Sequence, residues 1–271
     1  MIARVLAVLL TLLALPASAE PALTVAVGGP ERVYTPSALL ARPDAVTIAV
    51  PKDASYGRAM TYRAVPLRAL VAADALPRDG VLEAVASDGF VAHLPGALLA
   101  QTAGAEPYLA VEPPDAPWPP LPGKGVSAGP FYVVWLKPEA SGISSEQWPY
   151  QVARLLSADS PLARWPALGV AETLPADDPA RVGQALFLTN CLPCHTLNGG
   201  GGANVGPDLN RPMNPTEYLK PEALTKLIRD PASVRSWPEQ RMPAFAEAAL
   251  SDADLDRLVA YLQHMAGRKA K

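Results

Sequence analysis

The residues best suited to chemistry lie in one short segment, Cys191 to His195, which reads Cys-Leu-Pro-Cys-His. The segment holds the only two cysteines of the chain and one of its three histidines. Two thiols at this spacing lie about one helical turn apart on one face, where they can add to the two vinyl groups of one porphyrin. The next side chain, an imidazole, can then bind the iron. The segment therefore predicts covalent attachment of one haem, with His195 as an iron ligand.

Three other interpretations of the cysteine pair are weaker. A thioredoxin-like pair needs no following histidine and opens a helix after a strand, whereas the residues before Cys191 have helical spacing. A zinc site needs about four ligands, and only His93 and His264 remain as further imidazoles. A disulfide across two intervening residues is strained.

The motifs that follow resemble those of class I c-type cytochromes. A run of four glycines precedes Gly206-Pro207-Asp208-Leu209, and Met242-Pro243 comes later. In that family the proline carbonyl accepts the second N–H of the proximal imidazole, and the methionine supplies the sixth iron ligand. The resemblance implies a monohaem, all-α cytochrome c domain over residues 179–271 with one haem c. It also implies His195 and Met242 as the iron ligands, with Pro207 orienting His195.

Other residues compete for roles around this predicted haem. Met213 follows His195 closely, so it is poorly placed to reach the opposite face, and Met265 ends a helical pattern. Proline after Met242 favours an extended backbone there, which suits a loop that presses a sulfur onto a ring. We expect Trp237 and Arg241 to hydrogen-bond a haem propionate. For Arg241 a solvated surface charge is an equal alternative.

The first half, residues 20–172, predicts an α+β domain that is mostly β with short helices. Apolar runs separated by turn signals predict six strands and, near the end, a closing strand within 144–156. The six are Leu23–Val27, Val46–Val50, Val81–Ala86, Phe90–Leu94, Tyr108–Val111 and Phe131–Leu136. Proline at a first helical position predicts short helices that begin at Pro36 and Pro66, and Asp88-Gly89 predicts a tight turn. The proline-rich stretch 113–122 predicts an extended loop.

A second resemblance covers about residues 30–155. The run Tyr62-Arg63-Ala64-Val65-Pro66-Leu67, the Asp88-Gly89-Phe90 turn and the Gly129-Pro130-Phe131 strand start resemble motifs of the sulfite-oxidase-like molybdopterin-binding oxidoreductase domain. That family holds molybdenum through a cysteine thiolate, but both cysteines here belong to the haem segment. Ala64 also stands where the family has glycine. We therefore expect a degenerate domain without molybdopterin that serves as a scaffold or docks a partner.

Two further residues of this half attract attention. His93 lies on an expected strand, where a histidine bonded within the fold is the preferred interpretation over a site residue. Lys124, between two glycines, could meet an anion, although the segment lacks the full phosphate-loop pattern.

Residues 173–178 predict a linker, and Asp177 or Asp178 should cap a helix with Pro179 in its first turn. Val182, Ala185, Leu186 and Thr189 are expected on the buried face of that helix. Further helices are expected over 221–230 and after Ser251, where Leu255, Leu258, Val259 and Leu262 form an apolar stripe. The stripe should cross the first helix of this domain.

The N-terminus indicates export. Arg4, the apolar run 5–15 and Ala17-Ser18-Ala19 match a cleavable signal peptide over residues 1–19. The run is short for a membrane span, so we expect no stable span after cleavage and a periplasmic location. The net charge of -3 carries no basic stripe, which argues against nucleic acid as a partner.

Together these features predict an electron-transfer protein rather than an enzyme. Its partners would be a periplasmic dehydrogenase as donor and another cytochrome or a terminal oxidase as acceptor. A six-coordinate iron leaves no open position for substrate, so we assign no catalytic residue. The alternatives are a molybdenum-dependent, sulfite-dehydrogenase-like oxidoreductase with haem in the same chain, and a haem-linked sensor.

Overall fold

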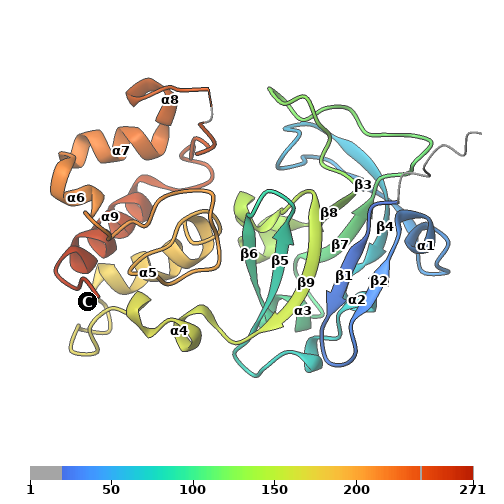
Figure 1. The fold of residues 1–271 in the computed structure, drawn as a ribbon, viewed down its shortest axis with the longest axis horizontal. Helices are drawn as coiled ribbons and strands as arrows, with labels where there is room; N and C mark the ends of the chain where they lie inside the picture. The colour runs from blue at the N-terminus through green and yellow to red at the C-terminus, as the bar shows by residue number, and fades with distance from the viewer. Residues whose placement is uncertain (1–19, 239, 271) are drawn as a thin grey trace, which may run out of the picture.

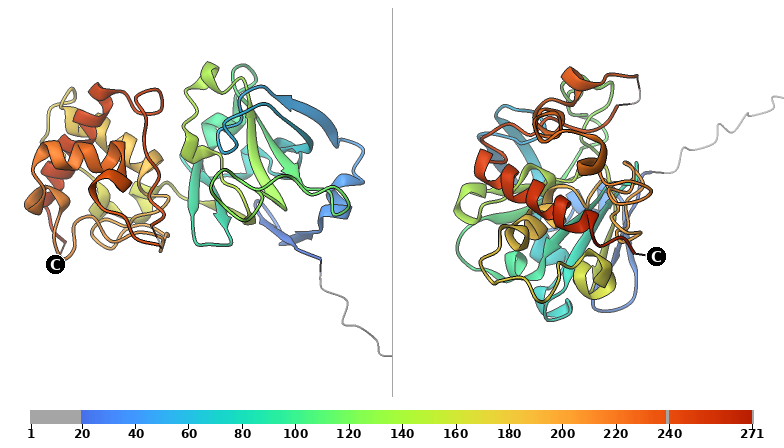
Figure 2. Two further views of the ribbon diagram at one scale, coloured as in Figure 1. Left: turned by 90° about the horizontal axis from the view of Figure 1, so that it is seen from above. Right: turned by 90° about the vertical axis from the view of Figure 1, so that its left-hand side faces the viewer.

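The computed structural model describes residues 20–238 and 240–270, so the expected signal peptide lies outside the described residues. Two regions lie side by side along the long axis: one is built on strands and holds the earlier residues, and the other is helical and holds the later ones (Figures 1 and 2). Within the described residues, no helix is both long and apolar enough to cross a membrane.

The N-terminal region contains two sheets. The first has the order β2 (Arg32–Tyr34), β1 (Leu23–Ala26), β9 (Val152–Ala158), β5 (Val81–Ala86) and β6 (Val91–Pro95). The second has the order β3 (Val46–Val50), β4 (Met60–Pro66), β7 (Glu106–Val111) and β8 (Phe131–Leu136). Only β1 and β9 pair in parallel. This pairing brings the start of the domain beside its end.

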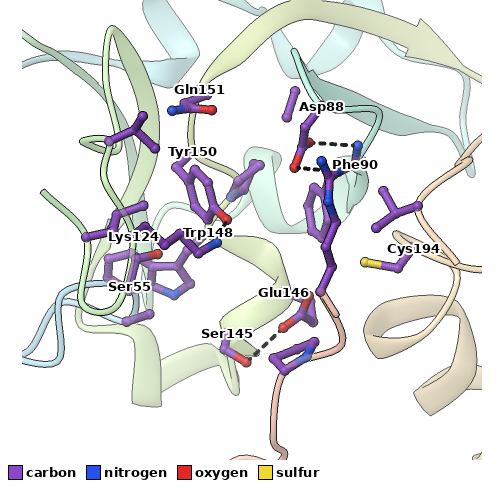
Figure 3. Close-up of a pocket in the computed structure, with 18 of the residues that line it drawn as sticks. Ser55, Asp88, Phe90, Lys124, Ser145, Glu146, Trp148, Tyr150, Gln151 and Cys194 are labelled. Carbon is purple, nitrogen blue, oxygen red and sulfur yellow. Dashed lines mark hydrogen bonds and ion pairs between the residues drawn. The ribbon is translucent and has the colours of Figure 1, made fainter. Parts of the chain in front are cut away.

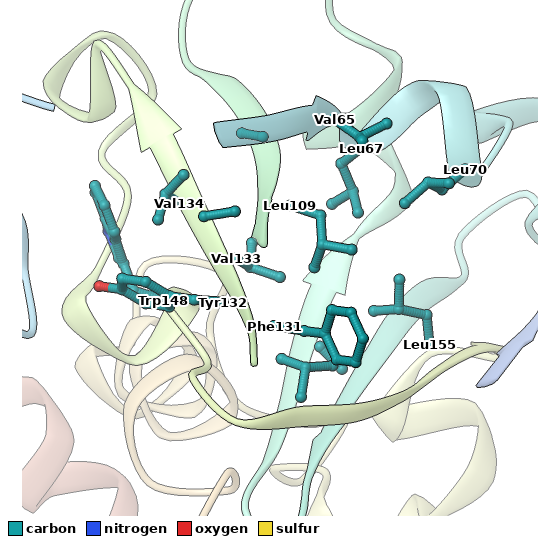
Figure 4. Packing of buried hydrophobic residues seen from close by; sticks show 14 of the residues in the cluster. Val65, Leu67, Leu70, Leu109, Phe131, Tyr132, Val133, Val134, Trp148 and Leu155 are labelled. Atoms are coloured by element: carbon teal, nitrogen blue, oxygen red, sulfur yellow. The ribbon is translucent and has the colours of Figure 1, made fainter. Parts of the chain in front are cut away.

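The core of this region fills the space between the sheets. Leu109, Phe131 and Val133 are fully buried and pack with Leu155 of the first sheet (Figure 4). The Trp135 indole N–H, also fully buried, donates to the Gln147 carbonyl at 2.8 Å. A buried indole needs such a partner because an unpaired polar atom in the core is costly.

The short helices of the N-terminal region are α1 (Pro36–Leu40), α2 (Leu67–Leu70) and α3 (Gly96–Ala100), with 3₁₀ turns η1 (Ala73–Ala75), η2 (Pro138–Ser141) and η3 (Ser145–Gln147). The helix start at Pro36 is confirmed: the Thr35 side chain caps it by accepting from Ala38 N–H at 3.2 Å. Pro66, in contrast, ends β4 and α2 begins one residue later. The Asp88-Gly89 turn is also confirmed, and Gly89 has a φ of 92° that favours glycine.

The helical region contains α4 (Pro161–Arg164), η4 (Pro166–Leu168), α5 (Pro179–Asn190), α6 (Pro215–Tyr218), α7 (Pro221–Arg229), α8 (Pro231–Val234) and α9 (Asp252–Ala266). Asp178 caps α5 and Ser251 caps α9 through their side chains, as expected. The expected crossing of α5 with α9 is also present.

The buried face of α5 differs from the expected one. It consists of Ala180, Gly183, Phe187 and Asn190, whereas Val182 is 44% exposed. Gly183 explains the difference, because a Cβ there would lie 2.0 Å from the Arg257 carbonyl oxygen of α9. The two helices approach each other too closely at this point for any side chain, so α5 turns its glycine inward.

The second core lies beneath this crossing. Leu255, Leu258 and Leu262 are buried as expected, joined by Tyr261 and Met265. The Tyr261 hydroxyl donates to the Leu168 carbonyl at 2.7 Å, and Ala171 N–H donates to His264 Nε2 at 3.0 Å. Residues from Leu162 onward therefore already pack on this core. The exact position of the domain boundary, predicted at 172–173, stays a prediction.

Candidate haem site

The Cys191–His195 segment follows directly from α5. Cys191 N–H donates to the Phe187 carbonyl at 2.9 Å and ends the helix. The chain then turns back, since the amides of Cys194 and His195 both donate to the Cys191 carbonyl, at 3.1 and 2.8 Å. Both cysteines are free thiols and half-buried. Burial, with the Glu146 carboxylate nearby, raises the pKa of Cys194 to about 12, so this thiol is neutral at pH 7.

His195 is oriented by a backbone carbonyl. Its Nδ1 lies 2.8 Å from the Pro207 oxygen. A carbonyl only accepts, so Nδ1 carries the proton and Nε2 keeps its lone pair. Burial lowers the pKa of His195, which favours the same neutral ring. A Cβ at Gly206 would lie 2.5 Å from His195 Cε1, so the backbone touches the imidazole where only glycine fits.

Asp208 organises the loop between His195 and Pro207. Its carboxylate accepts from backbone N–H groups of Asn198, Gly199, Asn210 and Arg211 and from the Thr196 hydroxyl, at 2.7–3.1 Å. Burial alone would raise the pKa of Asp208, but these hydrogen bonds outweigh it and hold the pKa low. The sequence analysis quoted this aspartate in its motif without assigning it a role.

A row of buried asparagines ties this loop to α9. Asn210 donates to the Asn198 side chain at 2.9 Å and to the Met265 carbonyl at 2.7 Å. Asn214 donates in turn to Asn210 and to the Leu262 carbonyl, both at 2.9 Å. Asn210 and Asn214 are fully buried. The sequence analysis missed them because an isolated asparagine in a loop gives no signal of its partners.

The methionines differ in their surroundings. Met242 is half-buried and packs against the second core, as Cys191 does from the same core's edge. Met213 is 49% exposed and Met265 is fully buried inside that core. Met242 is thus the one of the three that is neither solvent-facing nor enclosed. Its ligand role stays a prediction.

The two residues predicted at a haem propionate lie apart from each other's contacts. Trp237 is 43% exposed and carries the Arg235 guanidinium 5.0 Å above its ring. Arg241 turns toward the N-terminal domain, where its Nη1 lies 3.7 Å from Asp88 Oδ2. The propionate role stays a prediction for both.

The N-terminal domain packs directly on the cysteine segment. Val91 N–H, at the start of β6, donates to the Pro193 carbonyl at 3.0 Å. The Ser144 hydroxyl donates to Asn190 Oδ1 at 2.5 Å, next to the first cysteine. A Cβ at Gly89 would lie 2.0 Å from Asn204 Oδ1, so the turn after β5 meets the glycine-rich loop without a gap.

Between the two domains lies a cavity of about 620 Å³ (Figure 3). The N-terminal domain supplies Phe90, Trp148 and Tyr150 to its wall, and the C-terminal domain supplies Cys194 and Arg241. Neither His195 nor Met242 lines it. The cavity therefore adjoins the candidate haem site on the side of Cys194 and extends into the N-terminal domain.

His93 lies outside this site. It is buried on β6, with Nε2 at 3.2 Å from Glu83 Oε1, and Arg164 contacts the same carboxylate. Its ring meets Trp165 edge-on at 6.4 Å. His93 therefore connects β5 with the segment that leads into the helical region. Nowhere in 20–238 or 240–270 do three or more His, Cys, Asp or Glu side chains gather as a metal site.

Comparison with known families bears on the C-terminal region. Residues 180–266 match the family model Cytochrome c. The helical region thus holds a cytochrome c domain, which supports a haem-based role in electron transfer and interaction with redox partners. No family match supports the sulfite-oxidase-like resemblance of the N-terminal domain, which stays a prediction. No curated protein matches the chain.

The residues present fit a covalently bound haem. Two free thiols adjoin an imidazole whose tautomer leaves Nε2 able to bind a metal. A glycine holds the backbone against that imidazole, and a half-buried thioether lies on the same core. These donors are the ones that c-type haem requires.

Proposed function

We propose that this chain is an electron-transfer protein with one covalently attached haem, ligated by His195 and Met242, that works in the periplasm after loss of residues 1–19. The observation that carries the proposal is the 2.8 Å contact between His195 Nδ1 and the Pro207 carbonyl. It fixes the one tautomer and orientation that a proximal ligand needs.

The chain's own residues would divide the work as follows. Cys191 and Cys194 hold the cofactor through thioether bonds, and His195 and Met242 bind the iron. The second core, on whose edge both Cys191 and Met242 lie, excludes water from that side. When bound, the haem supplies reversible one-electron chemistry of iron, with a potential raised by a thioether ligand.

The N-terminal domain would act as the docking module of this carrier. It already holds the face of the C-terminal domain that carries the cysteines, through Val91, Ser144 and Asp88. A periplasmic dehydrogenase would donate electrons, and another cytochrome or a terminal oxidase would accept them. We propose no molybdopterin, because both cysteines of the chain lie in the haem segment.

Haem attachment and ligation are tested separately. Cys191→Ala or Cys194→Ala should abolish most covalent haem, and normal covalent loading in either variant would refute the proposal. Met242→Ala should keep the haem but turn the iron high-spin or lower its potential. Met213→Ala, at an exposed methionine, is the matched control. If Met213→Ala gives these changes instead, the ligand assignment is wrong. One iron and no molybdenum per chain is the expected metal content.

A further inference from the structure

We propose that the cavity between the two domains binds a small organic anion with an aromatic or otherwise apolar body, held against Lys124. This inference rests on the proposed function only for its redox meaning, because the cavity itself is formed mainly by the N-terminal domain. At about 620 Å³ it has the size of small-molecule sites, which often lie between domains.

The walls of the cavity suit an apolar, planar body. Trp148 and Pro149 are buried and form part of the lining, with Phe90 and Tyr150 beside them (Figure 3). Aromatic faces of this kind stack on flat ligands and exclude water from them. Leu121 extends the apolar lining below the loop that carries Lys124.

The charged groups favour an anionic head at Lys124. Its ammonium donates to the Tyr150 hydroxyl and lies 4.7 Å from that ring's centroid. No carboxylate lies within ion-pair distance of it in the described part of the chain. The other cation, Arg241, is already opposite Asp88 at 3.7 Å. An ammonium has three donors, so Lys124 has hydrogen-bonding capacity left for a ligand.

The remaining acid, Glu146, does not cancel this preference. Its only hydrogen bond in the described residues is a long one, 3.4 Å from the Ser145 hydroxyl. Burial raises the pKa of Glu146 to about 7, so its negative charge is partly lost at neutral pH. An anion bound at Lys124 would therefore meet little repulsion from the far wall.

The backbone on this side is built to present the site. Gly123, at a φ of 71°, lets the chain turn so that Lys124 N–H donates to the Leu121 carbonyl at 2.9 Å. Gln151 keeps a φ of 52°, which is rare for a residue with a side chain. Its backbone N–H and side-chain amide are held by Ala128 and Ser127. Strained residues of this kind gather at ligand sites.

The position of the cavity gives the ligand its significance. Cys194 lines it, so the porphyrin edge bonded to that sulfur would lie within reach of whatever the cavity holds. The propionates of a haem lie on the ring edge opposite the vinyl groups, which leaves Lys124 to another anion. A small molecule in the cavity would thus contact the edge through which electrons pass.

Binding of benzoate to the haem-loaded mature chain tests the inference by calorimetry, with benzyl alcohol and benzylammonium as probes of equal shape but different charge. We expect one benzoate per chain, weaker binding of benzyl alcohol and the weakest of benzylammonium. Lys124→Gln should weaken benzoate about tenfold or more, the size expected for a lost charged partner. Lys137→Gln removes an exposed lysine that does not line the cavity, and it should change nothing.

The outcomes are separable from those of the proposed function. Haem content and reversible reduction are measured on the same samples. If these are normal and benzoate does not bind, or binds Lys124→Gln equally well, the cavity inference is wrong and the electron-transfer proposal stands. Preferred binding of benzylammonium would also overturn it. Because Lys124 is exposed, its replacement should leave the fold intact, which circular dichroism verifies.

Discussion

Val91 N–H donates to the Pro193 carbonyl at 3.0 Å, which joins the first residue of β6 to the middle of the Cys191–His195 segment. The N-terminal domain therefore lies against the face of the cytochrome c domain that carries both cysteines. A partner protein can approach that face only if the two domains separate. The cavity beside Cys194 leaves room on that face for a small molecule.

This contact predicts a specific effect of proline at position 91. Val91→Pro removes the N–H, and proline is tolerated at the first residue of a strand. Val91→Ala keeps the N–H and trims the buried side chain, so it is the control. We expect Val91→Pro to lower the free energy of unfolding by about 1 kcal/mol more than Val91→Ala. Urea unfolding measures both, and equal values would mean that the hydrogen bond does not hold the domains together.

The contact of Gly206 with the imidazole predicts a second effect. In Gly206→Ala the new Cβ would lie 2.5 Å from His195 Cε1, so the ring must move away from Pro207. We expect a loss of haem per chain or a lowered reduction potential, measured by absorbance and redox titration. Gly202→Ala is the control in the same loop, since its Cβ would have no heavy atom within 4 Å. The same behaviour in both variants would show that His195 does not depend on this close approach.

Much of the fold could be predicted from the sequence, and the exceptions have physical reasons. Strands β3, β5 and β8 begin and end at the predicted residues, because continuous apolar runs bounded by turn residues mark both ends. Strand β2 was missed: it has three residues and is largely exposed, so it shows no apolar pattern. The buried face of α5 was wrong because small residues pack there, and hydrophobicity does not report close backbone approach.

The candidate site divides in the same way. Cys191, Cys194, His195 and Pro207 could be named because covalent chemistry and one carbonyl bond demand these residues at fixed spacing. The contacts of Val91, Ser144 and Asp88 with the helical region could not, because they join segments far apart in the chain through backbone groups or ordinary polar side chains. Sequence patterns report local periodicity, while docking of one domain on another depends on the finished surfaces of both.

The asparagine row predicts a third effect. Asn210→Ala leaves the Asn198 side-chain oxygen and the Met265 carbonyl without their shared donor, in a fully buried place. Each buried group left unpaired costs about 1–3 kcal/mol, so we expect a loss of about 3 kcal/mol in the free energy of unfolding. Gln263→Ala, at an exposed position of α9, is the control and should stay within about 0.5 kcal/mol. Similar small losses in both variants would argue that water replaces the amide.

The Glu83 carboxylate predicts a dependence of stability on pH. Burial alone would raise the pKa of Glu83, but contacts with His93 and then Arg164 outweigh it and hold the pKa below the ordinary 4.5. A lowered folded pKa stabilises the protein fully above pH 4.5, and this contribution is lost as the pH falls through the folded value. At pH 7, Glu83→Gln should therefore cost about 2 kcal/mol, because it leaves two cationic partners unpaired and Arg164 is only partly exposed.

The same reasoning fixes how Glu83→Gln compares with the wild type in acid. The difference in free energy of unfolding between the two should shrink below pH 4.5, where the wild-type carboxylate takes up its proton. Thermal or urea unfolding between pH 7 and pH 3 measures it. Glu106→Gln removes a carboxylate whose ion pair with Lys137 is exposed, and it should cost under about 1 kcal/mol at any pH. A Glu83→Gln deficit that stays constant down to pH 3 would mean that the side chain acts through packing, not charge.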